Sequence, residues 1–120
     1  MIMISIPMGN DSNWRERYKE VKTKLESQGY DVAPLTYKEM FGKRPPDFVE
    51  GLECQHTPLL YMAHSFYRMC MCDTVYFCKG WEEARGCRIE HWAALDYGLK
   101  VMYEDDENKE KPVVKAYTWD

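Results

Sequence analysis

Apolar residues follow two different spacings along this 120-residue chain. Four short runs are rich in apolar, aromatic or β-branched residues, and turn-forming residues separate them from longer amphipathic segments. Runs of this length and composition predict buried strands. The predicted strands are Ile2–Ile6, Tyr30–Pro34, Val75–Phe77 and Leu99–Tyr103.

Between these runs, apolar residues recur with the spacing of an α-helix. Apolar residues recur every three or four positions from Trp14 to Leu25, and Gln28-Gly29 is a typical helix end. A second helix is predicted over Leu59–Cys72, and a third beyond Lys79-Gly80. The apolar side of the second helix is expected to belong to the core and consists of Leu59, Met62, Ala63, Phe66, Met69 and Cys70.

This order of elements predicts a single α/β domain over residues 1–120. It is expected to be a Rossmann-like three-layer sandwich with a small, mainly parallel sheet of four to five strands. Residues 35–58 form an irregular excursion, rich in Gly and Pro. A functional loop, a segment that holds a short helix and a simple cover over a sheet edge remain alternatives for it. Pro112–Trp119 is a candidate edge strand or contact with another subunit.

Charge and composition narrow the classes of partner. The net charge of -4 disfavours nucleic acid, which requires a basic surface. No apolar run reaches membrane-spanning length, and the N-terminus lacks a signal-peptide pattern. We therefore expect a cytoplasmic protein that binds a small molecule or another protein, with neither nucleic acid nor membrane as a partner.

The five cysteines are odd in number and include no Cys-x-x-Cys pair, so we interpret them as reduced thiols. Zinc binding by Cys54, His56, Cys70 and Cys72 is a weak alternative, because Cys70 and Cys72 point to different faces of one helix. No metal and no cofactor is predicted. His64 and His91 have no obvious acidic or cysteine partner and are interpreted as ordinary, partly buried or surface residues.

Glu90 is the candidate chemical group. Gly86 and Ala94 lie one turn before and after it, and small neighbours on one helix face leave room beside a carboxylate. In a partly dry cleft such a carboxylate can attack the anomeric carbon of a nucleoside. The competing interpretation, a surface glutamate paired with an arginine, is favoured by residue physics alone.

Four sequence segments carry a family resemblance. They resemble a short, uncharacterised bacterial and phage family and are Ser5-Ile-Pro-Met-Gly9, Asp73-Thr-Val-Tyr-Phe, Gly80-Trp-Glu-Glu-Ala-Arg-Gly-Cys-Arg-Ile-Glu90-His and Ala94-x-x-x-Gly98. That family is similar to the nucleoside 2-deoxyribosyltransferases and the deoxynucleoside monophosphate N-glycosidases. The resemblance implies a Rossmann-like fold, a site at the carboxyl edge of the sheet and a homodimer or higher homo-oligomer.

Roles for individual residues follow from this resemblance. It implies that Glu90 is the catalytic nucleophile and that Gly86 opens the pocket. A nucleoside or nucleotide is the implied ligand, and its expected contacts are Pro7, Met8, Gly9, Gly80, Trp81, Arg85 and Gly86. For Arg85 and Arg88 a phosphate contact and a solvated surface charge remain equal alternatives, and Trp81 either stacks on the ligand or closes the core.

The chain departs from the related enzymes at three positions. Ser65 replaces an acidic residue that holds the base, Ala84 replaces a polar contact, and Ile6 replaces a glycine. These departures favour a binding module without catalysis, whereas the Gly86 to Glu90 spacing favours an N-glycosidase or deoxyribosyltransferase. Asp73 matches a recurrent aspartate, but its position before a strand favours a backbone cap.

Overall fold

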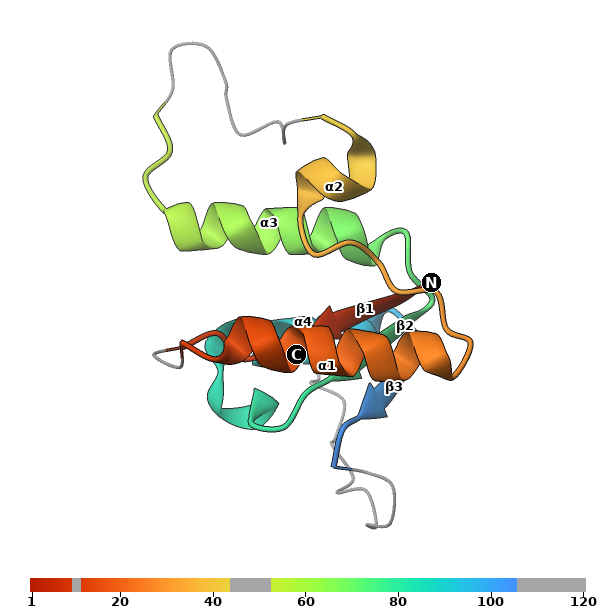
Figure 1. Ribbon diagram of the computed structural model, residues 1–120. Helices are drawn as coiled ribbons and strands as arrows, with labels where there is room; N and C mark the ends of the chain where they lie inside the picture. The colour runs from red at the N-terminus through yellow and green to blue at the C-terminus, as the bar shows by residue number, and fades with distance from the viewer. Residues whose placement is uncertain (10–11, 44–52, 106–120) are drawn as a thin grey trace.

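A three-stranded parallel sheet forms the centre of the protein (Figure 1). The computed structural model describes residues 1–9, 12–43 and 53–105. The strands within these ranges are β1 (Ile2–Ser5), β2 (Thr74–Phe77) and β3 (Lys100–Tyr103), in the order β1-β2-β3. Strands β1, β2 and β3 confirm three of the four predicted runs.

Five helical segments of the described ranges surround or flank this sheet. They are α1 (Trp14–Ser27), α2 (Tyr37–Phe41), α3 (Thr57–Met69), the short 3-10 helix η1 (Trp81–Glu83) and α4 (Arg85–Asp96). Helices α1, α3 and α4 correspond to the three predicted helices. Helix α1 ends at Gln28-Gly29 as expected, with Gly29 at a φ of 91° that favours glycine.

The sheet separates two hydrophobic layers. Ile2, Ile4 and Tyr76 pack against Tyr18, Val21 and Leu25 of α1 on one face. On the other face Met3, Val75 and Phe77 pack against side chains of α3 and α4. Figure 1 shows α1 and α4 on opposite sides of the strands, with α2 lying against α3. This arrangement confirms the mixed α/β class, because alternate residues of each strand face opposite layers.

The predicted strand Tyr30–Pro34 is reduced to a single bridge, so the prediction of four to five strands is wrong for the described residues. Val32 pairs in parallel with Ile2, and the flanking bonds run from Ile2 N to the Asp31 carbonyl and from Ala33 N to the Ile2 carbonyl, each 2.8 Å. The next residue, Pro34, has no N–H with which to continue the ladder.

The excursion predicted over residues 35–58 contains the short helix α2 within its described part, and its last two residues are the first two of α3. Helix α2 begins after Thr36, whose Oγ1 accepts a hydrogen bond from the Glu39 N–H at 3.1 Å and donates to Glu39 Oε1 at 2.9 Å. This reciprocal pair resembles a capping box. Residues 44–52 of the excursion and the candidate edge strand Pro112–Trp119 lie outside the described residues.

Helix α3 is less buried than its sequence predicts. Met69 is buried, whereas Leu59 is 66% exposed and Cys70 is also exposed. Contact with the sheet is made by the C-terminal end of α3, so the N-terminal turns extend past the core. No helix among the described ranges combines the length and apolar character needed to span a membrane.

Candidate functional site

The candidate site lies where the parallel strands end. Ser5 is the last residue of β1, and α4 follows β2 after the turn at Gly80 and the helix η1. Glu90 is the sixth residue of α4, with Gly86 and Ala94 one turn away on either side as predicted. The carboxyl edge of a parallel sheet is where α/β proteins commonly bind ligands.

Glu90 is held in a buried, polar contact with the first strand. Its side chain is 8% exposed, and Ser5 Oγ donates a hydrogen bond to Glu90 Oε1 at 3.0 Å. Burial raises the pKa of Glu90 to about 7, against the opposing effects of the Ser5 hydrogen bond, the Arg68 charge and a hydrogen bond with Ser65. Near neutral pH the carboxyl group therefore exists in both charged and neutral forms.

Groups from three elements surround this carboxylate. Ser5 comes from β1, Ser65 and the buried Arg68 from α3, and Cys87 from the preceding turn of α4. Burial raises the pKa of Cys87 to about 11, despite a hydrogen bond with Ser5, so this thiol stays neutral. The site thus contains one carboxyl group, one guanidinium and three small neutral groups.

Two loops meet beside α4. Gly80 has a φ of 90°, and a Cβ added to it would lie 3.6 Å from Cγ of Pro7. The loop after β1 and the loop after β2 are therefore adjacent at the carboxyl edge. A Cβ added to Gly86 would meet no heavy atom within 4 Å, which leaves open space on the helix face that carries Glu90.

The other predicted ligand contacts are solvent-facing. Met8 is 46% exposed, and Gly9 and Arg85 are exposed as well. Arg88 is also exposed and donates to the Glu82 carbonyl at 3.1 Å. The structure thus brings Pro7 and Gly80 close to the helix that carries Gly86 and Glu90. The side chains of Met8, Arg85 and Arg88 lie on the surface around this helix.

Trp81 packs on a buried histidine. Its ring stacks on His91 with centroids 4.0 Å apart, and it also contacts Phe77 and Tyr103. The His91 Nε2 atom lies 2.6 Å from the Tyr103 hydroxyl. One face of the indole ring is therefore occupied by the protein, an arrangement that fits the closure of the core edge more directly than ligand stacking.

His91 is fully buried, whereas the sequence suggested a partly buried or surface residue without a partner. Burial lowers the pKa of His91 to about 4, so the ring is neutral at pH 7. His64 is half-buried on α3 and contacts the rings of Tyr37 and Tyr61. His91 is thus an integral part of the aromatic cluster, which sequence spacing alone does not reveal.

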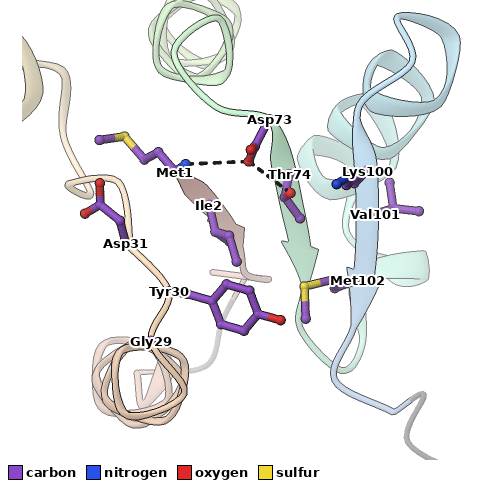
Figure 2. Close-up of a pocket in the computed structure, with 10 residues that line it drawn as sticks. All are labelled: Met1, Ile2, Gly29, Tyr30, Asp31, Asp73, Thr74, Lys100, Val101 and Met102. Carbon is purple, nitrogen blue, oxygen red and sulfur yellow. Dashed lines mark hydrogen bonds and ion pairs between the residues drawn. The ribbon is translucent and has the colours of Figure 1, made fainter.

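A hollow of about 580 Å³ lies at the opposite, amino edge of the sheet (Figure 2). Figure 2 shows Asp73 between the Met1 amino group and Thr74, at 3.5 Å and 3.0 Å respectively. The Thr74 hydrogen bond, together with the N-terminal charge, lowers the pKa of Asp73. These contacts agree with the interpretation of Asp73 as a cap, and the hollow is remote from Glu90.

The cysteines provide no cluster of metal ligands in the described part of the chain. Cys54, Cys70, Cys72, Cys78 and Cys87 are free thiols. No three His, Cys, Asp or Glu side chains within residues 1–9, 12–43 and 53–105 gather closely enough to hold a metal ion.

Sequence reasoning missed Ser5 and Arg68 as neighbours of Glu90. The alternation of β1 contained a signal for Ser5, because Ile2 and Ile4 face α1 while Met3 and Ser5 face the other layer. Arg68 lies one turn after Ser65 on α3, a spacing that places both on one helix face. These two patterns show which face each residue lies on, but they do not show that Glu90 is the neighbour. That follows only from the tertiary packing, including the contact between α3 and α4.

Comparison with known proteins identifies a family without assigning an activity. A family model described as a domain of unknown function, DUF4406, matches residues 2–103. Comparison with curated proteins gave no significant match, and comparison with solved structures gave none either. Because the match covers most of the chain, including β1, α4 and β3, this protein belongs to the DUF4406 family.

Proposed function

We propose that this protein cleaves the N-glycosidic bond of a nucleoside or nucleotide, or transfers its deoxyribosyl group, with Glu90 as the nucleophile. The observation that carries this proposal is the buried Glu90 carboxyl group, fixed by Ser5 at the carboxyl edge of the sheet. Its pKa of about 7 leaves a substantial ionised fraction at neutral pH. Open space beside Gly86 supports access along the same helix face.

The chemistry requires an anion beside a carbon that becomes positively charged. As the bond from C1′ to the base nitrogen breaks, the base leaves with the electron pair and an oxocarbenium-like sugar develops. A Glu90 oxygen forms an ester bond to C1′, which yields a covalent glycosyl-enzyme. Water or a second base then attacks C1′ and releases the Glu90 carboxylate. Low exposure strengthens the attraction between the anion and the developing cation.

The departing base must also gain a proton. The groups that shift the pKa of Glu90 within the described residues are Ser5, Arg68 and Ser65, and none of them is a carboxylic acid. Ser65 occupies the position at which the resembled transferases carry an acidic residue. We therefore propose that water protonates the leaving base, which favours substrates whose base leaves readily.

The second candidate function is binding of a nucleotide-derived metabolite without turnover. Ser65 favours it, because its side chain hydrogen-bonds to Glu90 and cannot act as an acid at neutral pH. Ala84, at the start of α4, lacks the polar group expected there. In this alternative the same residues recognise the ligand, and Glu90 is a hydrogen-bonding contact.

Incubation with nucleosides and deoxynucleoside monophosphates, with and without an acceptor base, distinguishes the two functions. Base release or exchange, followed by chromatography, is the readout. We expect Glu90→Gln to reduce turnover by about 10³-fold or more, since the amide is not a nucleophile. Glu83→Gln, at an exposed position in η1, is the matched control.

Two outcomes contradict the enzymatic proposal. Turnover that survives in Glu90→Gln excludes Glu90 as the nucleophile. Absence of turnover in the wild-type protein, together with ligand-induced thermal stabilisation of both the wild type and the variant, supports the binding function instead.

A further inference from the structure

Helix α3 carries apolar residues on two faces. On the inner face, Met69 is buried and Phe66 packs against the same core layer. Spacings of four, four and three residues define a second apolar stripe, whose members lie on one side of the helix. We call it the outer stripe, and it consists of Leu59, Ala63, Tyr67 and Cys70.

The outer stripe faces solvent although it contains no charged residue. Leu59 is 66% exposed, Tyr67 is 47% exposed, and Cys70 is exposed as well. Helix α2 lies against α3 (Figure 1), and the Tyr37 ring contacts the Tyr67 ring at a centroid distance of 5.4 Å, yet both stripe residues keep these exposures. Helices that are apolar on opposite faces are typically covered on both. The described residues cover only the inner face.

The apolar surface that α3 exposes has the size of a large part of an interface. Tyr61, and Met71 just after the helix, are 63% and 57% exposed. Together with Leu59 and Tyr67 they present on the order of 500 Å², which is within the range of functional apolar patches. Each partner of a stable complex buries roughly 800 Å². These four side chains therefore supply more than half of that area.

The outer stripe is complementary in shape to itself. Small Ala63 lies one turn from bulky Tyr67, and Leu59 and Cys70 lie at its two ends. If a second copy of α3 runs antiparallel, Tyr67 faces the partner's Ala63 and Leu59 faces the partner's Cys70. Two-fold interfaces require such self-complementarity. Arg68, the one charged residue of α3, is buried, so the stripe has no charge that would select a charged partner.

We propose that the outer stripe is an interface with a second copy of this chain, formed by an antiparallel pair of α3 helices about a two-fold axis. The contact extends from Leu59 to Cys70, about 16 Å along the helix. Burial of the apolar side chains drives association, and Ala63 allows the two helices to approach closely. The inference does not depend on the proposed function, and each can fail without the other.

Sedimentation velocity of the full chain over a range of concentrations tests the interface. We expect a dimer for the wild type at micromolar concentration. Leu59→Glu should raise the dissociation constant about tenfold or more, because it places a charge against an apolar surface. The monomer should stay folded, since Leu59 is exposed in the first turn of α3, where the helix dipole favours an acid. Ala63→Arg should weaken the dimer in the same way from the centre of the stripe.

Tyr97→Glu is the matched control, because Tyr97 is 79% exposed and lies at the end of α4, outside the stripe. It should leave the dissociation constant unchanged, and circular dichroism checks that every variant is folded. A wild-type protein that stays monomeric at hundreds of micromolar would overturn the proposal. A dimer that withstands both α3 variants would overturn it as well.

Leu59→Cys tests the antiparallel arrangement. The new thiol should form a disulfide with the partner's Cys70 when oxidised glutathione takes up the two thiol hydrogens and becomes two reduced glutathione molecules. We expect a covalent dimer in a non-reducing gel and its loss in Leu59→Cys/Cys70→Ser. Equal cross-linking of the two variants, or none in a protein that sediments as a dimer, would contradict the antiparallel pair.

Discussion

Two carboxyl groups at opposite edges of the same sheet have opposite electrostatic surroundings. Asp73 precedes β2 at the amino edge, where its side chain is 74% exposed and contacts Thr74 and the Met1 amino group. Glu90 lies at the carboxyl edge, 8% exposed and bonded to Ser5. The Thr74 hydrogen bond and the N-terminal charge lower the pKa of Asp73, whereas burial raises that of Glu90 to about 7.

The difference makes Glu90 a stronger candidate than Asp73 for the proposed chemistry. Asp73 is charged at neutral pH and contacts both the Met1 amino group and Thr74. It therefore links the amino ends of β1 and β2. Burial disfavours the anionic form of Glu90, and strongly shifted pKa values are frequent at functional sites. The size of the hollow at the amino edge is therefore a weaker guide to function than the state of the carboxyl group opposite it.

The largest expected effect is a stabilisation by Glu90→Gln at alkaline pH. The folded pKa of about 7 exceeds the ordinary value of 4.5, so the stabilising contribution of the neutral form is complete below pH 4.5 and lost as pH rises to about 7. Relative to the wild type, the variant should gain about 3 kcal/mol in unfolding free energy between pH 4 and pH 8. Urea unfolding at both pH values measures this.

Glu83→Gln serves as the reference for that measurement, because Glu83 is exposed on η1. A pH-independent difference between Glu90→Gln and the wild type would show that Glu90 is not desolvated in the folded protein.

The second effect belongs to His91. Its folded pKa of about 4 lies below the ordinary 6.5, so its contribution to stability is complete above pH 6.5 and is lost as pH falls toward 4. Compared with His91→Phe, which cannot titrate, the wild type should lose about 3 kcal/mol of unfolding free energy between pH 7 and pH 4. Parallel stability curves for the two proteins would mean that His91 is already solvated when folded.

A smaller effect is expected at Ser5. Ser5→Ala removes the hydrogen bond to Glu90 and should destabilise the protein by about 1 kcal/mol at pH 8, where the acceptor is charged. At pH 4, where Glu90 is neutral, the loss of unfolding free energy caused by Ser5→Ala should be smaller. Ser27→Ala, which removes an exposed hydroxyl bonded to the Lys24 carbonyl, is the control. Equal losses at both pH values would indicate that Ser5 acts through packing alone.

The smallest effect is expected at Asp73. Asp73→Asn weakens an exposed ion pair with the N-terminal amino group, and such pairs contribute little in water. Thermal unfolding in low and high salt should show a small shift that salt abolishes. A change in stability as large as that of Glu90→Gln would contradict the difference in electrostatic surroundings between Asp73 and Glu90.

The sequence predicted the layers of this fold better than the extent of the sheet. Apolar runs identified β1 and β2 because buried parallel strands carry few charged residues on either face. The same pattern identified β3, although Lys100 is exposed and the rest of that strand is only partly buried. The same signal over Tyr30–Pro34 overestimated the pairing, since a ladder depends on backbone donors and Pro34 has none. The exposed Leu59 shows a similar limit, because helical periodicity does not say how far a helix extends past its neighbours.

For the candidate site, the sequence identified Glu90 and the small residue Gly86 on one face of α4. It did not identify Ser5 or Arg68 as partners, because their proximity to Glu90 arises from tertiary packing between elements far apart in the chain. The stacking of Trp81 on His91 was missed as well, because residue spacing does not show which side chains of the consecutive segments η1 and α4 meet.

The register of the sheet also determines when the protein can fold during its synthesis. Ile2 pairs with Thr74 and Ser5 with Phe77, so β1 must wait for β2 before its ladder can form. The Ser5 to Glu90 hydrogen bond joins residues 85 positions apart. Contacts of such high sequence separation slow folding because a long loop must close first. Helix α1 can cover Ile2 and Ile4 early in synthesis, whereas Met3 on the opposite face of β1 is covered only when the second half of the chain has been made.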